Sequence, residues 1–192
     1  MAAVIEANNP KATMDSKEEV GFTYYYSAFL PESRASELQV AWPELLPAFK
    51  KCGVSSLSLN LTESVLKASI TRFHCQDYRA SHLLELLATT TVPPSLAIEL
   101  ALNDVIAYDL IKIGLQEDGF AWEYGIDKKR FSERRERLKK HYLEALEFAT
   151  DCHLYLGAHT VTAVATDSGW PASLGLNTVR KLVEQCIRYG PD

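Results

Sequence analysis

The sequence predicts an α+β protein made of two similar halves, each an antiparallel sheet covered by helices. Two segments, Ser55 to Thr71 and Cys152 to Ala165, alternate polar and apolar residues or gather β-branched ones around a turn, as hairpins do. An amphipathic helical pattern follows each hairpin. Both halves also have the order strand, helix, helix, strand, strand, helix, and a repeated order is stronger evidence than any single element.

In the first half, the aromatic run from Phe22 to Phe29 predicts the opening strand. The stretch from Glu32 to Lys51 favours helix, but Pro43 and Pro47 interrupt it and predict two short helices or a kink. In the hairpin that follows, Leu57, Leu59 and Leu61 share one face because strand side chains alternate. The closing helix is indicated by apolar residues at helical spacing, namely Ala80, Leu83, Leu84 and Leu87.

In the second half, Ile106 to Ile113 predicts the opening strand, and Lys128 to Ala149 is rich in helix-forming residues. The hairpin turns through Gly157-Ala158-His159, where glycine suits the turn. The stretch from Pro93 to Asn103 predicts an extra helix between the halves. The closing helix again has apolar residues at helical spacing, namely Leu176, Val179, Leu182, Val183, Cys186 and Ile187.

Charge is unevenly distributed along the chain. The net charge is −5, yet residues 127–140 hold eight Lys or Arg and three Asp or Glu, a local balance of +5 that leaves −10 for the remainder. An acidic protein is not a general binder of nucleic acid. Any contact with nucleic acid is therefore expected to be local and to involve this basic segment.

Several functional classes are disfavoured by what the sequence lacks. The cysteines, Cys52, Cys75, Cys152 and Cys186, lie far apart without the spacing of a zinc site, so we expect reduced thiols, no metal and no cofactor. No phosphate-binding glycine loop or nucleophile motif occurs, so we expect no enzyme and no small-molecule substrate. No run is long and apolar enough to cross a bilayer, and the start does not read as a secretory signal, so we expect no membrane association.

The sequence resembles the KRR-type ribosome assembly factors, KH-repeat proteins of the eukaryotic small-subunit processome, over about residues 29–188. The matching pieces are collinear: Phe29-Leu30-Pro31, Ala41-Trp42-Pro43, Gly53-Val54, Leu59-Asn60-Leu61, Thr71-Arg72, Val92-Pro93, Asp109-Leu110-Ile111-Lys112-Ile113-Gly114, Arg130-Phe131, Arg134-Arg135-Glu136-Arg137-Leu138, Leu143-Glu144-Ala145-Leu146-Glu147, Gly157 through Val164, and Val179 through Glu184.

The resemblance implies two type I KH-like modules, β-α-α-β-β-α, in tandem. It divides the chain into a disordered tail (1–21), a first KH-like domain (22–91), a linker helix (92–104) and a second KH domain (105–190). It further implies a non-catalytic factor of the nucleus and nucleolus, acting in the 90S pre-ribosome on 18S rRNA processing and 40S assembly. Its implied partners are pre-18S rRNA and other processome proteins that dock on the first domain.

The chain departs from this family at the loop that clamps RNA. A KH module holds single-stranded RNA with a glycine-x-x-glycine loop, which the family places between the arginine-rich helix and the Leu-x-Ala-Leu-Glu helix. Here Lys139-Lys140-His141-Tyr142 occupies that place without glycine, so the two helices could run on as one. Contact with the rRNA backbone would then fall to the basic residues, namely Lys128, Lys129, Arg130, Arg134, Arg135, Arg137, Lys139 and Lys140.

Alternative interpretations remain for both unusual segments. The basic residues could form a solvated face with intrahelical ion pairs, and the chain would then be a protein-interaction scaffold without functional RNA contact. The aromatics of Leu115 to Gly125 could stack on bases, but acidic neighbours favour packing on their own domain or on a protein partner. A hydrolase site in a cleft is a third and distant hypothesis.

Overall fold

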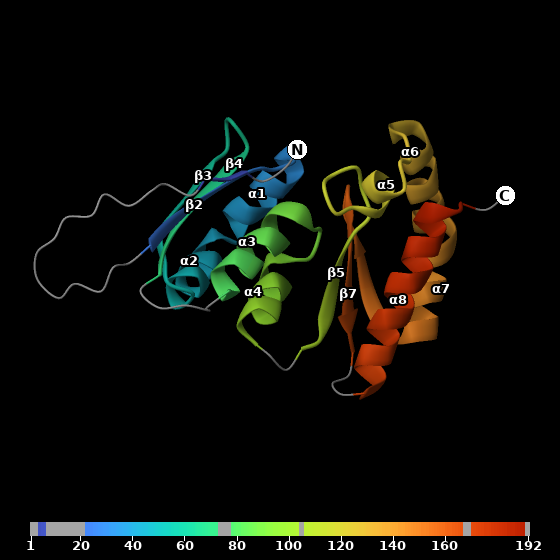
Figure 1. Ribbon diagram of the computed structural model, residues 1–192. Coiled ribbons are helices and arrows are strands. Elements are labelled where there is room, and N and C mark those ends of the chain that lie inside the picture. Colours follow the sequence, from blue (N-terminus) through green and yellow to red (C-terminus); the bar gives the residue numbers. More distant parts are fainter. Residues whose placement is uncertain (1–3, 7–21, 73–77, 104–105, 167–169, 191–192) are drawn as a thin grey trace, which may run out of the picture. The chain divides into compact units, whose positions relative to one another are not determined.

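The computed structural model describes residues 4–6, 22–72, 78–103, 106–166 and 170–190, and Figure 1 shows their helices and strands. The chain divides into two compact units, residues 1–88 with 93–102, and residues 89–92 with 103–192. Each unit holds an antiparallel sheet and its own helices, which confirms the predicted α+β class. The predicted domain boundaries and the roles assigned to each domain stay predictions.

The first unit contains a four-stranded sheet of order β1-β2-β4-β3. Its helices pack their apolar faces inward, with Leu38, Leu45 and Leu84 fully buried. Along the chain its elements are β1 (Val4–Glu6), β2 (Phe22–Phe29), α1 (Glu32–Val40), α2 (Trp42–Lys51), β3 (Val54–Asn60), β4 (Val65–Arg72), α3 (Arg79–Thr89) and α4 (Pro94–Leu102).

Two details of the first unit differ from the sequence-based expectations. Residues 1–21 were expected to be a disordered tail, but Val4–Glu6 forms β1, which pairs with the edge of β2. The physical reason is that β2 would otherwise end the sheet with unpaired backbone groups. The expected linker helix, α4, lies within the first unit and packs on α2.

The second unit contains a three-stranded sheet of order β5-β7-β6, with β7 in the middle. Its core is formed by β7 and the inner faces of the helices, with Ile111, Val161 and Val179 fully buried. Its elements are β5 (Tyr108–Lys112), α5 (Phe120–Glu123), α6 (Lys128–Arg137), the π-helix η1 (Leu138–Tyr142), α7 (Leu143–Thr150), β6 (Cys152–Leu156), β7 (Thr160–Ala165) and α8 (Trp170–Arg188).

An ion pair fastens the last helix to the first strand of this sheet. Arg180 of α8 donates from Nε to Asp109 Oδ2 over 2.7 Å and from Nη2 to Oδ1 over 2.5 Å. These bonds raise the pKa of the Arg180 guanidinium, so the side chain remains charged. A bidentate pair of this kind fixes orientation as well as contact.

Candidate nucleic-acid interface

The candidate interface is one continuous helical rod made of α6, η1 and α7. In η1 the bond pattern widens, because the N–H of Leu143 donates to the carbonyl of Leu138, five residues earlier. This wider turn brings Leu143 round toward the face of Leu138 and Leu146, and the latter two are buried. The rod therefore keeps both Leu138 and Leu146 in the core of the second unit across the wider turn. The prediction that the two helices run on as one is confirmed.

The first turn of the rod holds three exposed cations. Asp127 caps α6 by accepting from the N–H of Arg130 over 2.9 Å, and this bond lowers the pKa of the Asp127 carboxyl. Lys128 and Lys129 project into solvent, and the Arg130 side chain is 71% exposed although it lies 3.5 Å from the Asp127 carboxylate. The cap thus holds the helix start in place beside three accessible positive charges.

Two of the residues predicted to contact RNA, Arg134 and Arg135, make hydrogen bonds within the fold. Arg134 donates from Nη1 to the carbonyls of Ile187 and Arg188 over 2.6 and 2.9 Å, so it caps the end of α8. Arg135 donates from Nε to the Gly157 carbonyl over 2.9 Å and thereby ties α6 to the β6–β7 turn. These two guanidiniums hold the fold together, and their bonds reduce what they could offer to phosphate.

The middle of the rod presents a second group of cations. Lys139 and Lys140 lie in η1 and are exposed, as is His141 beside them. Within the part of the chain that the structure describes, the side chains of Lys128, Lys139 and Lys140 have no ion-pair partner. Arg137 is also exposed and stands next to η1. The rod therefore has one exposed basic group at its start and another at its π turn.

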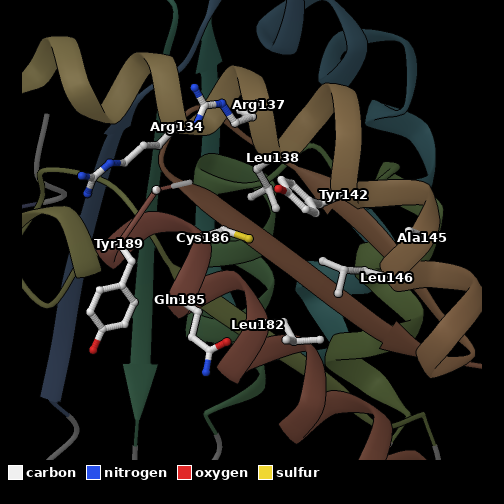
Figure 2. A pocket seen from close by; sticks show the side chains of 11 residues that line it. Arg134, Arg137, Leu138, Tyr142, Ala145, Leu146, Leu182, Gln185, Cys186 and Tyr189 are labelled. Atoms are coloured by element: carbon white, nitrogen blue, oxygen red, sulfur yellow. The ribbon is translucent and has the colours of Figure 1, made fainter. Parts of the chain in front are cut away.

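A pocket of about 450 Å³ lies between this rod and α8. Figure 2 shows Leu138, Tyr142 and Leu146 on the rod's side and Leu182 and Cys186 on the side of α8. Burial raises the pKa of the Cys186 thiol, which therefore stays protonated at neutral pH. Apart from Arg134 and Arg137 at one end, the walls are mainly apolar or uncharged, so phosphate has little to bind in this pocket.

The α7 part of the rod also packs against β6, which is an edge strand of the sheet. An edge strand can offer its backbone groups to an extended ligand. Here the Glu147 carboxylate accepts from the Leu154 N–H over 2.7 Å, and Arg135 occupies the Gly157 carbonyl. The chain's own side chains thus hold the backbone groups that a single strand of RNA would approach between the rod and β6.

The aromatic segment before α6 folds back on its own unit. Gly114 is required there because a β-carbon would stand 2.2 Å from His159 Nδ1. Tyr124 donates to Glu184 over 2.5 Å, and this bond raises the pKa of the Tyr124 phenol. Trp122 stays 56% exposed. Packing on its own domain is therefore found for Tyr124, while a role for Trp122 in a protein interface stays a prediction.

Sequence reasoning missed three of these arrangements. Glu147 lies in the Leu-x-Ala-Leu-Glu stretch with no local sign that it caps a strand edge, and the inward turn of Arg134 and Arg135 has no local sign either.

Among the described residues, no three His, Cys, Asp or Glu gather as metal ligands. No described helix combines the length and the apolar character that a membrane span requires.

The comparisons with known proteins agree with this geometry. Residues 107–189 match the family model of the KRR1 small subunit processome component, second KH domain. The fold resembles that of Dim2p from Pyrococcus horikoshii, with 13% identity, a TM-score of 0.54, and 87% and 92% of the two chains covered. A complex of archaeal eIF2α, Dim2p and rRNA from the same organism contains a similar fold, with 14% identity, a TM-score of 0.54 and 88% of each chain covered.

A protein of unknown function from Aeropyrum pernix also shares the fold, with 11% identity, a TM-score of 0.52, and 85% and 90% of the chains covered. At such identities these structures establish the fold alone. The family model adds a match in sequence over residues 107–189 of the second unit. In the second unit a π turn stands where a KH module has its glycine loop, and the Asp109–Arg180 pair joins α8 to β5. From Ala107 to Tyr189 the second unit is therefore similar to the second KH domain of the KRR1 small subunit processome component.

Proposed function

We propose that this protein is a non-catalytic ribosome biogenesis factor of the small-subunit processome, acting in the nucleolus on pre-18S rRNA. The observation that carries the proposal is a KRR1-type second KH domain whose rod exposes unpaired lysines to solvent. Its contact with rRNA is made by charge along the sugar-phosphate backbone, because the glycine clamp is absent.

Within this proposal the cations contribute unequally. Lys128, Lys129, Arg130, Lys139 and Lys140 contact phosphate, Arg137 lies beside them, and Arg134 and Arg135 position the rod by their bonds to backbone carbonyls. The first unit docks neighbouring processome proteins. At its α1–α2 junction Val40 is 84% exposed.

Particles purified from cells test the proposal through a fourfold charge reversal, K128E/K129E/K139E/K140E. We expect rRNA crosslinking by the second unit to fall at least about tenfold, because each lost cation removes the release of about one counterion. The control is K50E/K51E, because these two lysines are also adjacent and exposed but lie in the last turn of α2 in the first unit. Unchanged crosslinking in the fourfold variant would contradict the rRNA contact.

A protein-interaction scaffold without RNA contact is the second candidate. It is favoured by the closed strand edge, where Glu147 and Arg135 occupy the backbone groups of Leu154 and Gly157. The same experiment separates the two candidates. A scaffold keeps its place in the particle after charge reversal and shows no rRNA crosslink to the second unit in either protein.

A further inference from the structure

The surface that a single RNA strand would enter is closed in this domain. A KH module needs glycines at the helix junction so that the RNA backbone can approach the chain closely. Lys139, Lys140 and His141 lie there, within a helix that continues into α7 without a loop. On the neighbouring side, Glu147 holds the edge N–H of Leu154 over 2.7 Å. Entry of a single strand would have to break this bond.

The outer face of the rod has a charge pattern of its own. Lys129, Glu133, Glu136 and Lys140 follow one another at spacings of four, three and four residues, so they share one helix face. All four are exposed, and the Glu136 carboxylate also accepts from Arg135 Nη1 over 2.9 Å. The face therefore has lysines at both ends and carboxylates in the middle, of which Glu136 is ion-paired. A ligand with a continuous line of phosphates along the rod would be repelled at its centre by the Glu133 carboxylate.

The spacing of the two basic ends suits a ligand with two separate backbones. The eleven residue steps from Lys129 to Lys140 span roughly 16 Å at the rise of a helix. A double-stranded RNA presents two phosphate strands on either side of a wide, shallow minor groove lined by 2′-hydroxyl groups. If the rod crosses this groove, each basic end meets one backbone, while Glu133 and Glu136 face the groove floor.

The central carboxylates then gain partners instead of repelling phosphate. A ribose 2′-hydroxyl is a hydrogen-bond donor, and an ionised carboxylate only accepts. The floor of the minor groove of RNA supplies such donors, whereas DNA lacks the 2′-hydroxyl. The same face would therefore favour an RNA duplex over a DNA duplex of the same sequence.

We propose that the rod α6–η1–α7 binds double-helical RNA across its minor groove, with Lys128 and Lys129 on one backbone and Lys139 and Lys140 on the other. This inference rests on the proposed rRNA contact and specifies the form of RNA that makes it. The domain thereby retains the KH architecture but exchanges a single-strand clamp for a duplex contact.

Fluorescence anisotropy with the full-length protein and three labelled probes tests the inference. The probes are an RNA hairpin with a stem of about 16 base pairs, one strand of that stem, and the DNA hairpin of the same sequence. The RNA hairpin is also measured with the K139E/K140E variant. We expect the RNA hairpin to bind at least about tenfold more tightly than its single strand, and the variant to lose about tenfold. The DNA hairpin should bind more weakly than the RNA hairpin.

The outcomes separate this inference from the proposed function. Equal or tighter binding of the single strand would overturn the duplex contact while leaving an rRNA contact in place. Binding of neither RNA would overturn both. A second variant, E133A/E136A, isolates the role of the carboxylates: we expect it to bring RNA and DNA hairpins closer in affinity. An unchanged ratio would refute the contact with 2′-hydroxyl groups.

Discussion

The two units place different chemistry at the same point of the same fold. In the first unit, the junction of α1 and α2 breaks at Ala41, because Pro43 has no N–H for a continuous helix. The junction is apolar there, and Val40 is 84% exposed. In the second unit, α6 runs through η1 into α7 without proline, and Lys139 and Lys140 are among the exposed residues of η1.

The comparison shows that topology fixes the position of a junction, while a few residues fix what it can bind. Neither junction has the glycines of a single-strand clamp, yet one exposes a β-branched apolar side chain and the other a pair of cations. An apolar junction suits a protein surface, and a basic one suits phosphate. If the two junctions differ in this way, substitutions at them should differ in their effects on unfolding free energy and on RNA binding.

The largest expected effect concerns the two apolar residues at the junctions. Leu138 is fully buried and Val40 is 84% exposed. The Leu138→Ala variant should lose about 2–5 kcal/mol of unfolding free energy, because it leaves a cavity in the core of the second unit. The Val40→Ala variant should change stability very little. Chemical denaturation monitored by circular dichroism measures both, and similar losses in the two variants would contradict the difference between the junctions.

A smaller effect should appear in the first unit at high pH. Burial, and secondarily the nearby Glu85, raises the pKa of Tyr26 to about 12. A phenol whose pKa is raised by folding supports stability fully below its unfolded value of about 10, and this support disappears as pH rises from about 10 through about 12. At the upper end the loss should reach about 2–3 kcal/mol.

The Tyr26→Phe variant is the control, since it cannot ionise. Its unfolding free energy should fall less steeply than that of the wild type between these pH values, because the remaining slope comes from other groups. Identical pH profiles for the two proteins would mean that Tyr26 is not held neutral by the first unit.

Much of the fold could be predicted from the sequence because burial follows local periodicity. The break at Pro43 and the absence of glycine at Lys139 to Tyr142 are local signals, and each has the predicted structure. Leu57 and Leu59 lie in β3 as expected, but Leu61 falls beyond its end at Asn60 and is 41% exposed. The strand Val4–Glu6 was missed because it lies in a polar stretch and depends on the free edge of β2.

The site was less predictable because its cations look alike in sequence. Whether an arginine on α6 faces solvent or a carbonyl depends on elements far along the chain, namely the end of α8 for Arg134 and the β6–β7 turn for Arg135. The role of Glu147 likewise depends on a strand edge formed only in the folded unit. Charge count could locate the basic segment, but tertiary contacts decide which of its members are available.

The salt dependence of RNA binding tests the central claim most directly, since it counts the phosphates that the rod neutralises. For the RNA hairpin, the slope of log affinity against log salt should become shallower by about two in K139E/K140E and remain unchanged in K50E/K51E. This result would place the contact on the basic junction of the second unit. Equal slopes for the wild type and both variants would contradict it.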